Sequence, residues 1–527
     1  MPFLRPTTGA RSAHVAQSPF SPPLSSPVPL CLALLCLALT LVGCVSSPPV
    51  VRERVSAPRA PVTVLADTSA ADLAIHASRT LFAESSLVVV AAMDDANAQA
   101  SAAKRAITWG VPLLLVAGRG PAGPSPKQTA QSYSHSTTAI FRELQRLKVH
   151  TIATVGRIAP LGQVSATVVA AATIQHTRTT SPPAGGVAVI VSADSRTVAA
   201  SATASAVGAT VQKLAPGAAD LQASARAITF LHTNPAQAVL LIGADFASIA
   251  DPDWSVAAAR SGYQLTGGGQ RLFPDHRFVA IYGAPGVPSL GVVGEQDAAA
   301  TVLRARTVAE PFAALSSVPV VPMLELIATV AAGDAGSDGD YSNELPVERL
   351  TPFVDAAADA GLYVVLDLQP GRANFLDQAK QYLPLLKRPN VGLALDPEWR
   401  LSPDQLPLRQ IGSVDASEVN AVAAWLAGVV TAGGLPPKMF VLHQFTSRMI
   451  ADRASIDTSH PQLEVLVHAD GQGSQPAKQA TWNALHSNAP SGVSWGWKNF
   501  YDEDTPMLTP EQSMSSVVPT PQLFTYQ

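Results

Sequence analysis

The chain has 527 residues, 47% of them hydrophobic and 6% aromatic, so it is long enough for about three domains, each with its own core. Its 35 basic residues are balanced by 39 acidic ones, and no Lys/Arg run or stripe is present. Nucleic-acid binding, which depends on clustered cations that contact phosphates, is therefore not expected.

An apolar run close to the N-terminus predicts an export signal. Val28–Val42 is 15 residues long, which falls short of the roughly 20 residues that span a bilayer but suits the hydrophobic part of a signal peptide. The run leads into Leu41–Cys44 (Leu-Val-Gly-Cys), which resembles a bacterial lipobox, where the cysteine receives a lipid and the bond before it is cut. The alternative interpretation of the run is a buried helix of the fold.

Cleavage before Cys44 would remove residues 1–43 as a signal peptide, together with Cys31 and Cys36. The mature chain would then carry Cys44 alone, so neither an internal disulfide nor a cysteine metal site is expected. Residues 44–61 contain four prolines and predict an extended linker. We therefore expect a lipoprotein held to the cell membrane by an acyl chain such as palmitate on Cys44, with its folded part on the extracytoplasmic face.

Apolar segments alternate with helical patterns from residue 62 to residue 265. The predicted elements are, in chain order, helix 70–82, strand 86–92, helix 96–109, strand 111–116, helix 138–147, strand 150–155, strand 186–192, helix 196–207, helix 217–231 and strand 238–243. Continuous apolar strands joined by helices are typical of a parallel sheet covered on both faces. The first region is thus predicted to be α/β, and a polar loop is predicted over residues 118–135.

This region resembles the cell wall-binding repeat type 2 family. The resemblance is carried by Ala71–Ser78, Leu87–Val90, Asp94–Ala98, Gly110–Leu115 and Glu143–Leu147. It implies modules that hold a surface protein on anionic wall polymers, so a cell-wall polysaccharide is the expected partner of residues 62–265. The alternative is a structural α/β region with no ligand.

The pattern of residues 277–527 predicts eight strands with helices between them. The strands are 277–282, 319–328, 362–368, 391–395, 438–445, 464–469, 493–500 and 522–527. About 250 residues of strand-then-helix units are typical of a (β/α)₈ barrel. The clearest helices are 351–360, 375–386 and 417–432, and Thr351 and Pro352 are predicted to begin the first of them.

Polar side chains follow these strands where each strand ends. The active face of such a barrel lies at the C-terminal ends of its strands, so the side chains are expected to share one pocket. The candidate catalytic carboxyls are Asp396, Glu398, Glu325, Asp367 and Asp470. The candidate substrate-binding residues are His443, Gln444, His468, Trp495, Trp497 and Lys498.

Glycoside hydrolysis needs two carboxyl groups across a sugar ring, and aromatic faces stack on sugars. Asp396 or Glu398 is the candidate for one carboxyl, and Glu325, Asp367 or Asp470 for the other. The pattern is similar to glycoside-hydrolase-type barrels, and residues 392–400 also resemble a block of uncharacterised actinobacterial lipoproteins. The sequence thus predicts a barrel that binds or hydrolyses an envelope carbohydrate.

Two alternatives to catalysis remain at this stage. The barrel face could bind a glycan or scaffold a protein without turnover, or its acids could pair with nearby arginines in a structural role. Zn²⁺ binding by His443, His468 and Asp470 is a further option, but no short His-x-x-x-His spacing supports it, and no metal or cofactor is predicted.

Overall fold

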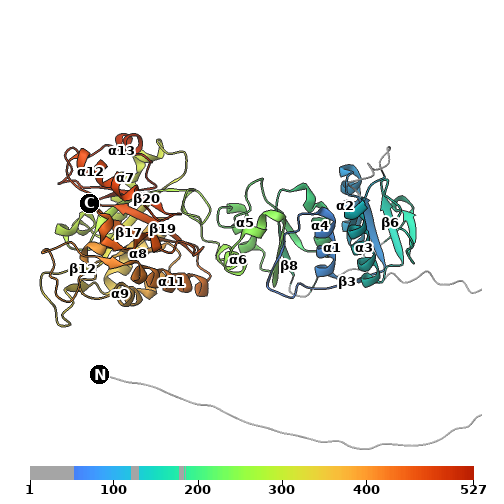
Figure 1. Cartoon of the computed structure of the whole chain (residues 1–527), viewed down its shortest axis with the longest axis horizontal. Helices are drawn as coiled ribbons and strands as arrows, with labels where there is room; N and C mark the ends of the chain where they lie inside the picture. The colour runs from blue at the N-terminus through green and yellow to red at the C-terminus, as the bar shows by residue number, and fades with distance from the viewer. Residues whose placement is uncertain (1–52, 120–129, 177–182, 184–185) are drawn as a thin grey trace, which may run out of the picture. The chain divides into compact units, whose positions relative to one another are not determined.

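A computed structural model describes residues 53–119, 130–176, 183 and 186–527 (Figure 1). The expected signal peptide and residues 44–52, which are half of the predicted linker and include Cys44, lie outside the described residues. Within them, no helix combines the length and apolar content needed to cross a membrane.

The first region contains two four-stranded parallel sheets. One sheet has the order β5-β4-β6-β7, and its strands are β5 (Leu113–Val116), β4 (Leu87–Ala92), β6 (Thr151–Val155) and β7 (Thr167–Ala170). The other has the order β2-β10-β8-β9, and its strands are β2 (Val62–Leu65), β10 (Ala238–Ile242), β8 (Val187–Val191) and β9 (Thr210–Lys213). The helices of this region are α1 (Ala70–Leu81), α2 (Ala96–Trp109), α3 (Ala130–Leu147), α4 (Val198–Ala206), α5 (Ala225–Thr233) and α6 (Pro252–Arg260), with a short antiparallel pair β1 (Glu53–Val55) and β3 (Phe82–Ser85).

Strand β4 explains why the sequence pattern indicated a sheet covered on both faces. Val88 and Val90 pack in one hydrophobic cluster with residues of α1 and α3. Leu87 and Val89, which alternate with them, pack in another cluster with alanines of α2. Both faces of the strand are therefore buried, as a continuous apolar run requires.

One helix of this region is shorter than predicted. The predicted helix over 217–231 begins only at Ala225, because Ser224 has an extended backbone and its side chain accepts the N–H of Ala227 (3.2 Å). A serine in this position satisfies one of the free N–H groups of the first turn, so it begins a helix rather than continuing one.

The second region is a closed barrel of eight parallel strands, which confirms the predicted (β/α)₈ fold. The strands follow one another around the barrel in chain order, and β11 closes it by pairing with both β12 and β21. They are β11 (Arg277–Gly283), β12 (Val320–Ala331), β14 (Tyr363–Leu368), β15 (Val391–Leu395), β17 (Lys438–Gln444), β19 (Leu463–Ala469), β20 (Ser494–Asn499) and β21 (Leu523–Tyr526). A short strand, β13 (Ser342–Glu344), extends β12 in the antiparallel sense.

Helices lie between successive strands in chain order, except between β17 and β19, where the connection contains only 3-10 turns and a two-residue strand. They are α7 (Ala298–Ala313), α8 (Val347–Asp359), α9 (Phe375–Gln381), α10 (Leu383–Leu386), α11 (Ala416–Gly433), α12 (Gln475–His486) and α13 (Pro510–Ser516).

The prediction that Thr351 begins a helix was wrong. Helix α8 starts at Val347, and the Thr351 hydroxyl donates to the Val347 carbonyl (2.8 Å) inside it. The extra turn buries Leu350 completely, and such packing is the main source of helix stability in proteins.

The barrel interior is apolar at one end and polar at the other. Phe278, Met323, Tyr363 and Leu466 belong to a single buried cluster inside the barrel. Gly392 lies in the same crowded layer, where a Cβ atom would come within 2.5 Å of the Met439 carbonyl oxygen. Since side chains alternate along a strand, the residues at even spacings further on also point inward, and the polar residues of the site stand at such positions.

Candidate functional site

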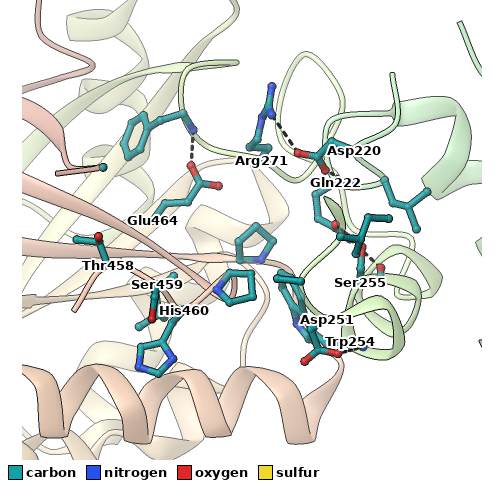
Figure 2. A pocket seen from close by; sticks show the side chains of 18 of the residues that line it. Asp220, Gln222, Asp251, Trp254, Ser255, Arg271, Thr458, Ser459, His460 and Glu464 are labelled. Carbon is teal, nitrogen blue, oxygen red and sulfur yellow. Dashed lines mark hydrogen bonds and ion pairs between the residues drawn. The ribbon is translucent and has the colours of Figure 1, made fainter. Parts of the chain in front are cut away.

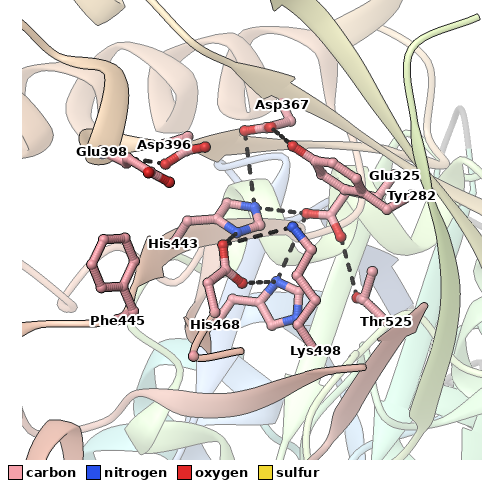
Figure 3. A network of polar contacts seen from close by, with 12 residues as sticks. Tyr282, Glu325, Asp367, Asp396, Glu398, His443, Phe445, His468, Lys498 and Thr525 are labelled. Carbon is pink, nitrogen blue, oxygen red and sulfur yellow. Dashed lines mark hydrogen bonds and ion pairs between the residues drawn. The ribbon is translucent and has the colours of Figure 1, made fainter. Parts of the chain in front are cut away.

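Seven of the eight barrel strands each place one polar side chain into a single network at the C-terminal end of the barrel, and the position directly after β15 adds another (Figure 3). In strand order the contributors are Tyr282, Glu325, Asp367, Asp396, His443, His468, Lys498 and Thr525. Glu398 and Asp470, which lie just after their strands, complete the set. The structure therefore brings together the five predicted carboxyls and three of the six predicted binding residues.

His443 lies at the centre of the network and is fully buried. Its Nε2 lies 2.8 Å from Glu325 Oε1, and its Nδ1 lies 2.7 Å from Asp470 Oδ2. Burial on its own lowers the pKa of His443, but the facing Asp470 and Glu325 carboxylates outweigh it and raise the pKa well above its ordinary value. The isolated protein therefore holds an imidazolium that donates a hydrogen bond on each side.

Tyr282 and Asp367 form the side of the network next to Glu325. The Tyr282 hydroxyl donates to Asp367 Oδ2 at 2.7 Å, and both side chains are buried. Burial is the main reason that the pKa of Asp367 rises to about 6, and the negative charge of Glu325 adds to it, against the opposing effect of His443. Asp367 is thus a carboxyl that can gain or lose a proton near neutral pH.

Asp396 and Glu398 lie together at the end of β15, where the Glu398 N–H donates to Asp396 Oδ1 at 3.2 Å. Burial and the neighbouring Asp367 raise the pKa of Asp396 well above its ordinary value. Burial and the charge of Asp470 raise the pKa of Glu398. Glu398 is only half-buried, so this carboxyl, whose pKa is raised, faces the solvent.

Asp470 is the other network carboxyl that keeps contact with solvent, with 11% of its side chain exposed. Burial on its own would raise the pKa of Asp470, but His443 and Lys498 outweigh it and hold the pKa below its ordinary value. The Lys498 ammonium lies 3.7 Å from Asp470 Oδ2 and 3.6 Å from the centre of the Tyr282 ring. The mouth of the site therefore presents two carboxyls whose pKa values are shifted in opposite directions.

His468 is buried, and neither of its ring nitrogens has a hydrogen-bond partner in the described part of the chain. Burial lowers the pKa of His468 to about 4, so the ring is neutral. One donor atom each from Glu325, His443 and His468 lies within 4.8 Å of the others. These three residues are the ones in the network that could hold a metal ion.

Three of the predicted binding residues face away from the network. Trp495 and Trp497 pack behind β20 around Trp482, with ring centres 5.7 Å apart in each case. Gln444 accepts the Nε–H of Arg453 at 2.8 Å. Because strand side chains alternate, Lys498 can point inward only if Trp495 and Trp497 do not.

The sequence prediction missed three members of the site. Tyr282 and Thr525 follow the inward-facing residues of β11 and β21 at a spacing of two, so strand alternation could have identified them. Phe445 is a half-buried aromatic one residue after β17, and its ring lies at the edge of the network (Figure 3). Nothing in the local sequence distinguishes it from a core phenylalanine.

A pocket of about 470 Å³ lies elsewhere, between the loops around residues 219–273 and the starts of β19 and β20 (Figure 2). In it the Glu464 carboxylate accepts the backbone N–H groups of Leu272 (2.8 Å) and Phe273 (2.6 Å), and Arg271 pairs with Asp220 (3.0 Å). Burial raises the pKa of Glu464 to about 8. The N-terminal end of a barrel is the stabilising end, and these contacts fasten the segment before β11 to it.

No protein-family model and no curated protein matches this chain. Among solved structures, Cwp6 from Clostridium difficile is similar in part, with 12% sequence identity and a TM-score of 0.27. The likeness covers 66% of this chain and 66% of that protein, slightly less than two thirds of its length. At this TM-score the likeness carries no argument about fold or function.

Proposed function

We propose that the barrel hydrolyses a carbohydrate of the cell envelope, with Glu398 and Asp470 as the two reacting carboxyls. The observation that carries the proposal is their position. Of the network carboxyls, these two keep contact with solvent at the barrel end where enzymes of this fold bind their substrates. The remaining acids are buried beneath them.

The chemistry follows the two-carboxyl scheme of glycoside hydrolysis. Glu398 protonates the oxygen of the leaving sugar, a role that its raised pKa favours. Asp470, paired with His443 and Lys498, acts on the other side of the sugar ring. It either takes a proton from the water molecule that attacks the anomeric carbon, or attacks that carbon itself and is then released by water, and in both cases the bond to the leaving oxygen breaks. The half-buried Phe445 supplies an aromatic face at the rim on which a sugar can stack.

The envelope location rests on the sequence. The apolar run and the Leu-Val-Gly-Cys motif that ends at Cys44 support export and lipid anchoring. The resemblance of residues 62–265 to wall-binding modules supports contact with wall polymers. A lipoprotein placed there would meet envelope polysaccharide as its substrate.

The test is the release of reducing sugar from purified cell-wall polysaccharides. We expect the wild-type protein to release sugar, and Glu398→Gln and Asp470→Asn each to lose at least about a hundredfold in rate, since a positioned acid or base contributes about 10²–10⁴-fold. The matched controls are Glu310→Gln and Asp359→Asn, which replace exposed carboxyls on the outer helices α7 and α8. Equal rates in all five proteins would contradict the assignment.

A non-catalytic glycan-binding role is the second candidate. It is favoured by the extent of burial, because Glu325, Asp367, Asp396 and His443 mostly contact one another. In that case the wild-type protein binds wall polysaccharide without releasing sugar, and Glu398→Gln leaves the bound fraction unchanged.

A further inference from the structure

Glu325, His443 and His468 point donor atoms toward a common centre inside the barrel. They come from three different strands, β12, β17 and β19, and all three side chains are fully buried. We propose that they bind one divalent transition-metal ion. Two imidazoles and one carboxylate are a donor set that suits Zn²⁺ and leaves a coordination position open. This inference goes beyond the proposed function and does not depend on it.

The first independent support is that His468 is buried without a hydrogen-bond partner among the residues that the structure describes. A buried imidazole with no hydrogen-bond partner is rare, because its desolvation is not compensated. Its Nδ1 lies 3.9 Å from Glu325 Oε1 and 3.8 Å from Asp470 Oδ1, and that aspartate oxygen also has no hydrogen-bond partner among the described residues. Two ligands of a tetrahedral Zn²⁺ ion lie about 3.4 Å apart, given bonds of about 2.0–2.2 Å. A shift of about half an ångström would let Glu325 and His468 share one ion.

The surroundings of His443 are the second support. A histidine that binds a metal through one nitrogen usually donates its other N–H to a carboxylate, which fixes the ring. Asp470 takes this role at Nδ1 (2.7 Å), and Nε2 faces Glu325 Oε1 at 2.8 Å. The ion would take the place of the proton that Nε2 and Glu325 share. Glu325 Oε2 in turn accepts the Thr525 hydroxyl at 3.2 Å, so the carboxylate is also oriented.

The local charge favours a cation despite the nearby lysine. Lys498 pairs with Oδ2 of Asp470, whereas the other oxygen of that carboxylate faces His468. Asp367 is a third carboxyl at the same centre, with Oδ1 3.9 Å from His443 Nε2 and without a hydrogen-bond partner in the described chain. Three carboxyl groups around one ammonium leave negative charge that a divalent ion would neutralise once it has displaced the proton from His443.

The experiment measures the metal itself, so its outcome does not depend on whether the protein cleaves sugar. The full chain is stripped with a chelator, dialysed and titrated with Zn²⁺ and, separately, with Co²⁺. We expect one equivalent of Zn²⁺ to bind and the Co²⁺ protein to show the strong visible absorption of a four- or five-coordinate ion. If the stripped wild-type protein binds neither metal, the proposal is wrong. This part of the experiment uses only the wild-type protein, so its result does not depend on whether a variant folds.

Variants locate the site. His468→Asn and Glu325→Gln should each weaken Zn²⁺ binding by about a hundredfold or more, and Asp470→Asn, which removes only the partner of His443, by about 10–100-fold. The control is His460→Asn, a partly exposed histidine paired with Asp457 outside the network. Retention of wild-type affinity in His468→Asn and Glu325→Gln would place the metal elsewhere and overturn the assignment. Circular dichroism identifies any variant that loses binding because it does not fold.

Discussion

Glu464 is a buried acid whose proton affects the stability of the whole barrel. The folded protein raises its pKa from 4.5 to about 8, with burial as the main cause and the N–H groups of Phe273 and Leu272 opposing it. Between these two values the native state therefore binds more protons than the unfolded chain. Stability from this group is present below pH 4.5 and is lost as the pH rises toward 8.

We expect the free energy of unfolding to fall by up to about 1.4 kcal/mol per pH unit in this window because of Glu464. Glu464→Gln, which carries no titratable proton, should remove that slope. The measurement is the urea midpoint at pH 5, 6.5 and 8 for the wild type, this variant and the exposed control Glu310→Gln. Parallel declines in wild type and Glu464→Gln would show that another group is responsible.

The residues of the site could be predicted from the sequence where a residue of suitable chemistry also stands near the C-terminal end of a strand and faces inward. Every predicted carboxyl joined the network, because each stands at an inward-facing position of an apolar strand or just after one. Trp495 and Trp497 did not, since they alternate along β20 with the inward-facing Lys498 and pack on the outer side of the strand. The missing partners of His468 are a property of three-dimensional packing and leave no trace in the sequence.

At the scale of elements, β15 shows how the order of residues along one strand determines where the apolar interior of the barrel ends and the polar site begins. Gly392 and Ala394 occupy the crowded interior, and Asp396 follows them at the next inward position. A larger residue at the first of these positions would press on the backbone of β17. Barrel interiors are packed in layers, so the neighbouring strand has little freedom to retreat.

Gly392→Ala should therefore destabilise the protein by about 1–3 kcal/mol, as overpacking in a core does. Its Cβ would meet the Met439 carbonyl oxygen at 2.5 Å and the Tyr363 ring at 3.2 Å. Gly428→Ala is the matched control, because nothing lies within 4 Å of its added Cβ in helix α11, and alanine there should stabilise by about 0.5–1 kcal/mol. Chemical denaturation measures both changes, and a shift of the same sign in the two variants would refute the packing argument.

The elements themselves were predictable where the hydrophobic pattern is continuous. All eight barrel strands overlap their predicted ranges, and helix α2 has the predicted bounds. Strand β2 was not predicted, because four residues with one fully buried position carry too weak a pattern. β2 joins its sheet by pairing with β10, which lies far along the chain, and the local sequence does not indicate such a long-range contact.

At the scale of the whole molecule, the predicted lipid anchor can be tested directly. In a bacterial host that processes lipoproteins, we expect the protein to incorporate labelled palmitate and to sediment with membranes. Cys44→Ser should abolish the label because it removes the only thiol that the lipobox can modify. Cys31→Ser is the control, since it lies in the segment that is cut away, and it should leave the label unchanged. An unlabelled wild-type protein would exclude the anchor.

The size of the second region and its eight strands made the barrel predictable as a whole, but its last strand has a consequence of its own. β21 joins β20 to β11, and it also carries Thr525, which orients Glu325. Neither the wall of the barrel nor its polar centre can therefore be completed until residue 526 has left the ribosome. A nascent chain that has not yet reached residue 526 would remain an open, unfinished sheet, which is the state that an export machinery must receive if it is to thread the polypeptide across a membrane.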